Sequence, residues 1–322
     1  MAPNLIRVRV EKKEIEAVDV ASYVLVPVDG SQMPRFEAGA HIDVHIDDNI
    51  VRQYSITNNQ GQLNRYLIGV LRDNNGKGGS ISMHDRVEEG DILHISEPRN
   101  HFHLVEDKPR YILFAGGIGV TPIISMAQRL HDLGRDFEFH YCCRSEDRAA
   151  FTNWIKTSGF ARRTHFHWDD GEKDQLLDLP ALLADRAEDT QIYVCGPKGF
   201  MDWVIRTTEE HNWPEADVHR EYFSADPKAG HDDDDNFTVK IASSGAEYSV
   251  GPEQTIFEVL EQNGVNVPVS CEQGICGVCV TGVLDGEPEH RDLFMTKSEQ
   301  AKNDKMTICC SRAKSKSLTL DI

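Results

Sequence analysis

Five of the eight cysteines in this 322-residue chain lie near its C-terminal end, and their spacing is the strongest chemical signal in the sequence. Cys271, Cys276 and Cys279 form the pattern C-x4-C-x2-C, and Cys309 supplies a distant fourth thiol. This is the plant-type spacing of a 2Fe-2S cluster. A structural zinc site is the alternative, but zinc loops more often pair two C-x2-C knuckles, so the spacing favours the cluster. Strand alternation would point Cys310 to the opposite face, and we predict Cys309 as the fourth ligand.

A strand end and a glycine-rich loop together indicate a site for a flavin and its phosphate. The strand carries Arg52, Tyr54 and Ser55. An arginine can pair with a phosphate or a ring carbonyl, a tyrosine can cover a flat ring, and a serine hydroxyl can bond a ring nitrogen. The loop leads into a predicted helix, whose free amides would bind a phosphate. Its candidate ligands are Lys77, Gly78, Gly79 and Ser80. Each segment alone also fits an ordinary strand or a plain glycine turn.

Two further turns carry glycine where a predicted strand ends. The first, GGIGVTP at 116–122, opens a helix and has proline at the last position of the G-x-G-x-x-G pattern. Its glycines allow close backbone approach, and the helix end attracts a pyrophosphate. The second, CGP at 195–197, follows a later strand. The alternative for each turn is a tight connection without a ligand. The predicted nucleotide-binding residues are Gly117, Gly119, Thr121, Cys195, Gly196 and Pro197.

Three kinds of architecture must position these motifs. Short strands separated by turns, beginning with Ile6–Val10, predict an antiparallel β-barrel at 1–103. Alternating strands and helices, including a helix over Ala149–Thr157, predict an α/β domain with a parallel sheet at 104–225. An acidic linker is predicted at 226–236. A small α+β domain follows at 237–322, with a helix that carries Ile256, Val259 and Leu260.

The composition limits the classes of partner. Lys and Arg number 34 against 53 Asp and Glu, which gives a net charge of −19 and disfavours nucleic acid and anionic lipid surfaces. Hydrophobic residues make up 39% of the chain, as in an ordinary packed protein. The apolar runs fall short of the ~20 residues that a membrane-spanning helix needs, and the N-terminus has no signal-type apolar core. We therefore expect a cytoplasmic protein.

Taken in order, the motifs RQYS, GKGGS, GGIGVTP, CGP and CEQGICGVC with the downstream ICCSRAK resemble the phthalate dioxygenase reductase family. This family comprises the flavin and 2Fe-2S reductases of two-component Rieske oxygenases, vanillate demethylase reductases among them. The resemblance spans nearly the whole chain. It implies a barrel that binds FMN, an α/β domain that binds NADH and a β-grasp ferredoxin domain. It also implies that Phe223 packs against the flavin ring.

The implied function is to take hydride from NADH onto FMN and to pass single electrons through the cluster to a Rieske-type oxygenase. No catalytic side chain is assigned, and Ser55 would be the nearest to one. Glu146 or Asp147 could bind a ribose 2′-hydroxyl, whereas Arg144 could attract a 2′-phosphate, and the resemblance favours NADH. Two alternatives stay open. One is a flavin reductase that serves a cytochrome P450 or a free ferredoxin, and the other is a non-catalytic, redox-sensing iron–sulfur protein.

Overall fold

The computed structural model describes residues 5–47, 50–74, 78–184, 186–223 and 235–322. These residues divide into two compact units, Met1–Glu221 and Tyr222–Ile322. Most of the predicted linker, and with it the aspartate run up to residue 234, lies outside the described residues, and so does Lys77 of the predicted phosphate loop. No helix in the described ranges combines the length and apolarity needed to cross a bilayer.

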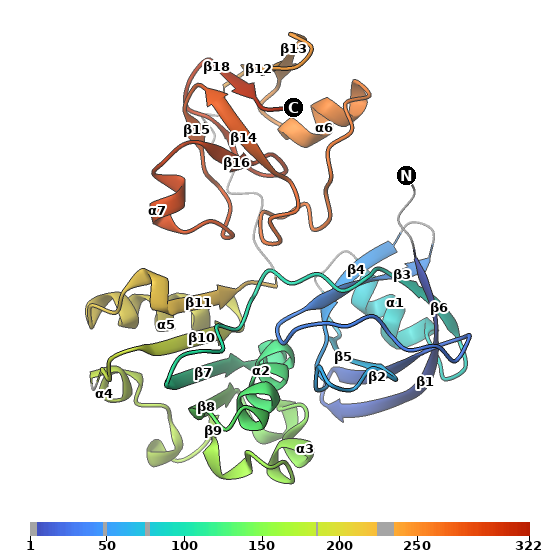
Figure 1. Ribbon diagram of the computed structural model, residues 1–322, viewed down its shortest axis with the longest axis vertical. Helices are drawn as coiled ribbons and strands as arrows, with labels where there is room; N and C mark the ends of the chain where they lie inside the picture. Colours follow the sequence, from blue (N-terminus) through green and yellow to red (C-terminus); the bar gives the residue numbers. More distant parts are fainter. Residues whose placement is uncertain (1–4, 48–49, 75–77, 185, 224–234) are drawn as a thin grey trace. The chain divides into compact units, whose positions relative to one another are not determined.

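The first part of unit one is an antiparallel sheet of six strands in the order β4-β3-β6-β1-β2-β5. A bridge between Ile56 and Ile68 links its two edge strands and closes the barrel (Figure 1). The strand predicted at Ile6–Val10 continues to Ala17, because polar residues of β1 stay paired with β2 past a bulge. The elements are β1 Ile6–Ala17, β2 Val20–Pro27, β3 His41–Asp47, β4 Ile50–Ser55, β5 Tyr66–Leu71, α1 Gly79–Arg86 and β6 Ile92–Ile95.

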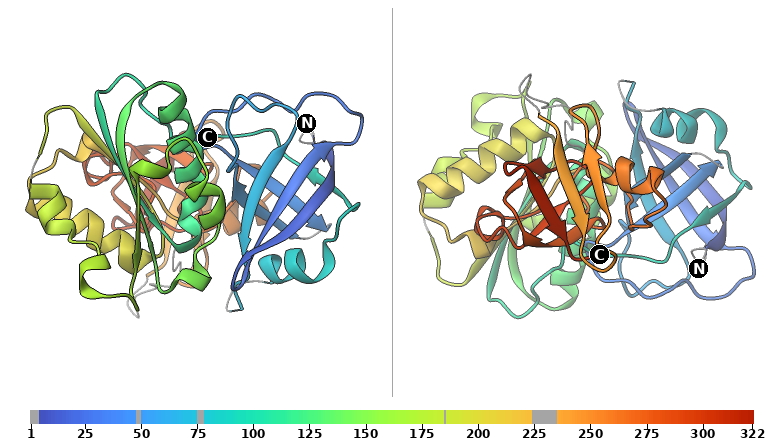
Figure 2. Two further views of the ribbon diagram at one scale, coloured as in Figure 1. Left: turned by 90° about the horizontal axis from the view of Figure 1, so that it is seen from below. Right: turned by 90° about the horizontal axis from the view of Figure 1, so that it is seen from above.

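The second part of unit one is a five-stranded parallel sheet in the order β11-β10-β7-β8-β9. Helices α2 and α3 pack on one face, where the largest apolar core lies, and α5 covers the other face (Figure 2). The elements are β7 Arg110–Gly116, α2 Val120–Asp132, β8 Asp136–Cys143, α3 Thr152–Lys156, β9 Thr164–Trp168, α4 Leu179–Ala184, β10 Thr190–Cys195, α5 Lys198–Glu210 and β11 Val218–Glu221. Short 3-10 turns occupy Gly117–Gly119, Glu146–Arg148, Ala161–Arg163, Lys173–Gln175 and Glu215–Asp217.

The helix predicted at Ala149–Thr157 is shorter in the structure. Phe151 adopts a left-handed backbone with φ 61°, which a helix cannot continue through, so α3 begins at Thr152. Residues 149–151 are instead buried in the core beneath the sheet.

The barrel and the parallel sheet are joined by polar contacts along α2. Ser125 Oγ donates to the carbonyl of Asn58 at 3.2 Å, and Gln128 Nε2 donates to the carbonyl of Thr57 at 2.9 Å. A Cβ on Gly69 of β5 would lie 2.8 Å from Cγ2 of Thr121. The two parts of unit one are therefore held in close contact by backbone and side-chain groups alike.

Unit two is built on a five-stranded mixed sheet in the order β13-β12-β18-β14-β16, with α6 over its core. Helix α6 covers the predicted helical stretch, and a capping box between Thr255 and Glu258 fixes its start. The elements are β12 Phe237–Ile241, β13 Glu247–Val250, α6 Ile256–Gln262, β14 Val280–Asp285, β15 Pro288–Glu289, α7 Lys297–Gln300, β16 Lys305–Thr307, β17 Arg312–Ala313 and β18 Ser317–Leu320. The multidomain fold with an antiparallel sheet, a parallel sheet and a ferredoxin-type α+β unit is thus confirmed.

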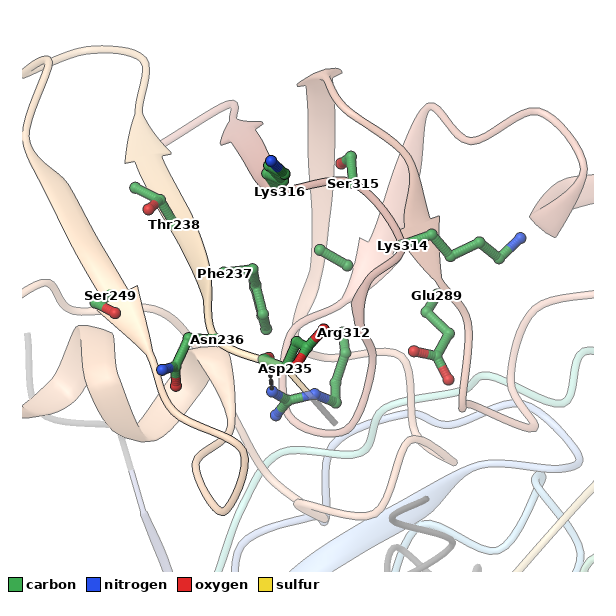
Figure 3. A pocket seen from close by; sticks show the side chains of 11 residues that line it. Asp235, Asn236, Phe237, Thr238, Ser249, Glu289, Arg312, Lys314, Ser315 and Lys316 are labelled. Carbon is green, nitrogen blue, oxygen red and sulfur yellow. Dashed lines mark hydrogen bonds between the residues drawn. The ribbon is translucent and has the colours of Figure 1, made fainter. Parts of the chain in front are cut away.

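A buried arginine ties the entry of unit two to the segment after the last cysteines. Arg312 donates to the carbonyls of Gln254 at 2.8 Å, Gly251 at 3.1 Å and Asp235 at 3.1 Å, and its guanidinium lies 5.0 Å from the centroid of the Phe237 ring. Arg312, Asp235 and Phe237 line an open pocket (Figure 3), whose volume is about 560 Å³. The start of β12 and the strand that follows Cys309 and Cys310 are therefore held together by one side chain.

Candidate functional site

The two segments of the predicted flavin site meet in the structure. A Cβ on Gly79 would collide with Nε of Arg52, so the Arg52 side chain crosses the start of α1 where only glycine leaves room. Gly78 precedes it with φ 83°, a left-handed conformation that suits glycine. The first amides of a helix have no partner within the helix and carry partial positive charge. The Arg52 guanidinium and the first amides of α1 thus form a positively charged site that fits a phosphate.

The remaining residues of this site offer unused polar groups. Tyr54 Oη is buried and has no hydrogen-bond partner among the described residues. Burial raises the pKa of Tyr54, so its hydroxyl stays protonated. Ser80 Oγ accepts a hydrogen bond from the amide N–H of Asp73 at 3.0 Å, and as a hydroxyl it can also donate to a ligand. Ser55 is buried at the end of β4, beside the paired residue His41.

The two predicted nucleotide turns lie in backbone contact at one edge of the parallel sheet. β7 and β10 are neighbours, and their carboxyl ends lead into the GGIG and CGP turns. A Cβ on Gly119 would collide with the carbonyl of Cys195, and a Cβ on Gly196 would lie 2.9 Å from Cα of Gly116. The chain order reverses between β7 and β10, and ligands of open α/β sheets bind at such switch points. The glycines therefore present bare backbone where a dinucleotide can approach.

Two of the predicted nucleotide residues turn their side chains elsewhere. Thr121 Oγ1 donates to the carbonyl of Ile118 at 3.0 Å, and its methyl group faces Gly69 of the barrel. Cys195 is fully buried, and burial raises the pKa of its thiol well above the usual value. Any contact of Cys195 with a nucleotide would run through its backbone.

A carboxyl group that the sequence pattern did not predict lies at this same edge of the sheet. Glu221 ends β11 and is the register partner of Cys195 on β10. Burial raises the pKa of Glu221 to about 8, and its Oε2 has no partner among the described residues. Nothing in the sequence distinguishes this glutamate from others at strand ends, because the burial of its carboxyl is a property of the folded chain.

We expect Glu221→Gln to stabilise the α/β domain increasingly as pH rises. Below pH 4.5 the folded and unfolded states both hold the proton, and between 4.5 and about 8 only the folded state keeps it, so wild-type stability falls. The variant lacks this loss, and its advantage at pH 7 should reach about 3 kcal/mol. The four tryptophans all lie between 154 and 213, so their fluorescence during chemical denaturation reports on this domain. Exposed Glu188→Gln is the control, and equal pH profiles for Glu221→Gln and wild type would contradict the assignment.

Glu146 and Asp147, the two carboxylates that the sequence suggested as ribose ligands, both have side-chain partners in the structure. Glu146 Oε1 lies 2.9 Å from Nζ of Lys156, and the Asp147 carboxylate accepts the hydroxyl of Ser145. Arg144 is exposed at the end of β8. A ribose bound here would have to share or displace these two contacts.

The four predicted cluster cysteines converge in unit two. The thiol of Cys271 contacts those of Cys276 and Cys309, and Cys309 also reaches Cys279. The contacts with the Cys276 and Cys309 thiols lower the pKa of the Cys271 thiol well below its usual value, and the amide of Gln273, which donates to Sγ of Cys271 at 3.4 Å, lowers it further. No group of three or more His, Cys, Asp or Glu in the described ranges surrounds a single ion position. The thiol contacts run from Cys276 through Cys271 and Cys309 to Cys279, and four cysteine thiols are the ligand set of a 2Fe-2S cluster.

Backbone shape and packing support the loop that carries three of these thiols. Gly274 and Gly277 have φ 69° and 71°, so the loop curls in a way that side chains disfavour. A Cβ on Gly274 would collide with Sγ of Cys310, and one on Gly277 would collide with the ring of Phe294. The loop therefore fits closely against the segments on either side of it.

Cys310 differs from Cys309 in its partners. Its Sγ lies 3.2 Å from Oγ1 of Thr307 and 3.9 Å from Oγ of Ser311. The Cys310 thiol also contacts that of Cys309, and its other partners are the two hydroxyls, whereas the Cys309 thiol contacts those of Cys271 and Cys279 as well. This arrangement favours Cys309 as the ligand.

Phe223 is 38% exposed and belongs to the second unit. Its contact with the flavin ring stays a prediction.

Two family models match the chain. Residues 239–314 match the 2Fe-2S iron-sulfur cluster binding domain, and residues 113–206 match the oxidoreductase NAD-binding domain. These ranges contain the four converging cysteines and the two glycine turns.

Similarity to known proteins extends over the whole chain. The chain is 50% identical over 318 residues to a vanillate O-demethylase oxidoreductase of a Pseudomonas species, covering 99% of this chain and 100% of the relative. The solved structure of phthalate dioxygenase reductase is 36% identical with a TM-score of 0.73, and the match covers 99% of this chain and 98% of that one. An intact type IV self-sufficient cytochrome P450 monooxygenase is 35% identical with a TM-score of 0.85, but this chain spans only 41% of it.

Proposed function

Because the chain belongs to the family of reductases that includes phthalate dioxygenase reductase and the vanillate O-demethylase oxidoreductases, we propose that it supplies electrons to an oxygenase that acts on vanillate or a similar methoxylated aromatic acid. The observation that carries this proposal is the 50% identity to a vanillate O-demethylase oxidoreductase along the full length of both chains. The protein is an NADH-dependent oxidoreductase with FMN and a 2Fe-2S cluster, and its partner is a terminal oxygenase. We further propose that it works in the cytoplasm, where NADH is supplied.

The flavin matches the two-electron chemistry of NADH to the one-electron chemistry of the cluster. We assign the flavin phosphate to the start of α1, with Arg52, Gly79 and Ser80 as its ligands. Tyr54 contributes a hydroxyl that has no other partner, and Ser55 lies at the end of the same strand. Lys77, which lies outside the described residues, would add a further positive charge.

The α/β domain binds and orients the dinucleotide. Gly117 and Gly119 would admit the pyrophosphate to the start of α2, and the backbone of Gly196 and Pro197 would line the other side. Because Glu221 keeps its proton near neutral pH, it adds no negative charge to this edge. Thr121 holds the domain against the barrel rather than the nucleotide.

The four cysteines hold the irons, and the buried surroundings exclude water from three of them. Cys276, Cys279 and Cys309 are each at most 5% exposed. Cys271 is half-buried and lies on the more open side of the loop. Electrons would leave the cluster on this side.

The test is a reconstituted electron-transfer assay. With NADH in excess, the purified protein should support vanillate consumption by a vanillate O-demethylase oxygenase component, in proportion to the amount of reductase. Cytochrome c serves as an artificial acceptor that checks reductase activity. A P450 haem domain is the comparison acceptor, because the self-sufficient P450 contains a similar module. Rapid reduction of the P450 without vanillate consumption would overturn the proposal.

A further inference from the structure

Two side chains of the barrel hold the C-terminal end of α1. Lys13 Nζ donates to the carbonyls of His84 and Val87, each at 2.8 Å. Tyr23 Oη donates to the carbonyl of Met83 at 2.9 Å. The last carbonyls of a helix have no partner within the helix, so Tyr23 and Lys13 satisfy those of Met83 and His84. Lys13 also bonds the carbonyl of the C-cap residue Val87 and lies 2.9 Å from the carboxylate of Glu88.

Lys13 and Tyr23 act from a rigid base. They are register partners on β1 and β2, Tyr23 is fully buried and the Lys13 side chain is only 13% exposed. The Lys13 ammonium lies 5.9 Å from the centroid of the Tyr23 ring. A cation at a helix C-terminus also interacts favourably with the helix dipole.

Other contacts hold the same end of the helix. Arg72 Nη2 donates to Oδ2 of Asp85 at 3.1 Å, and His84 Nε2 lies 2.9 Å from the carbonyl oxygen of Val70. At the opposite end, Gly78 supplies no side-chain cap. The helix is thus fixed from its C-terminal end while its first amides face the proposed phosphate.

The two ends of α1 lie too far apart for one side chain to reach both. Eight residues at 1.5 Å each make α1 about 12 Å long, so Lys13 and Tyr23 cannot contact a phosphate at its start. They can only set the direction in which the first amides point.

We propose that Lys13 and Tyr23 are positioning residues for the flavin phosphate, acting through α1 without touching the cofactor. This inference rests on the proposed phosphate site at the start of α1. Loss of the Lys13 or the Tyr23 contact lets α1 tilt or fray, and its first amides then no longer point together at the phosphate. The isoalloxazine contacts on β4 are left unchanged.

The experiment compares FMN with riboflavin, which lacks the phosphate. Both are titrated by fluorescence quenching into the full chain freed of flavin, for wild type, Lys13→Met, Lys13→Arg and Tyr23→Phe. Lys12→Met is the matched control, since Lys12 is an exposed neighbour on the same strand with its own partner, Glu14. We expect Lys13→Met to weaken FMN binding about tenfold with riboflavin affinity unchanged, Lys13→Arg to restore most of it, and Lys12→Met to resemble wild type.

Each other outcome is decisive. Equal loss for FMN and riboflavin would mean general damage to the barrel and would overturn the inference, as would unchanged FMN affinity in both Lys13→Met and Tyr23→Phe. If Lys13→Met does not fold, Tyr23→Phe carries the test, because it removes only one hydroxyl. If wild type binds FMN and riboflavin equally, the phosphate site itself is wrong, and the inference is overturned together with it.

Discussion

Cys276→Ser should remove the visible absorption of the iron–sulfur cluster while the flavin band and NADH-driven flavin reduction remain. The thiol of Cys276 contacts Cys271 in the converging set, and no other thiol of that set can replace it without moving the loop. Electron delivery to the oxygenase should fall to background, because the flavin loses its one-electron acceptor. Absorption spectra, iron content and stopped-flow reduction by NADH measure these three quantities.

Cys309→Ser and Cys310→Ser form a matched pair for the same prediction. The first should lose the cluster like Cys276→Ser. The second should keep it, because a serine at 310 can still bond the hydroxyls of Thr307 and Ser311. A cluster lost in Cys310→Ser and kept in Cys309→Ser would reverse the ligand assignment.

Gly119→Ala should abolish most NADH-driven flavin reduction without loss of flavin or cluster. Gly119 has an ordinary helical backbone with φ −60°, so the effect is steric rather than conformational. The new Cβ would collide with the carbonyl of Cys195 and lie 2.6 Å from the amide nitrogen of Gly196. The two nucleotide turns must then separate, and a displacement approaching 1 Å costs about a hundredfold in rate.

The control for this variant is Gly199→Ala, a glycine in α5 whose Cβ would meet nothing within 4 Å. It should behave like wild type. Chemical reduction by dithionite should be normal in both variants, which separates nucleotide binding from damage to the electron carriers. Normal NADH kinetics in Gly119→Ala would show that the dinucleotide approaches elsewhere.

The parts of the site that the sequence predicted are those where chemistry fixes local spacing. Three thiols must come from one curled loop, so Cys271, Cys276 and Cys279 are readable as a pattern. Backbone contact between the turns at Gly119 and Gly196 demands glycine, and glycine at a strand end is visible in the sequence. The alternation of strands and helices likewise predicted the parallel sheet.

The rest depends on long-range packing that leaves no local pattern. Thr121 lies in a nucleotide-type motif, yet its methyl group meets Gly69, which is 52 positions earlier in the chain. Glu221 looks like any polar residue at a strand end, and its pairing with Cys195 of β10 and the burial of its carboxyl arise only in the folded chain. Phe151 seemed part of a helix by periodicity, but its place in the core imposes a left-handed turn. In each case the residue's surroundings are supplied by segments that the fold brings together, not by its neighbours in the sequence.

The buried carboxyl of Glu221 also couples nucleotide binding to the uptake of a proton. A chain with a net charge of −19 must accept a dinucleotide that carries two phosphate charges, and above pH 8 this edge would gain one more negative charge of its own. An anion that arrives there favours the protonated carboxyl. In mildly alkaline solution, NADH binding should therefore draw a proton from the buffer, and the heat of binding should vary with the ionisation enthalpy of the buffer chosen.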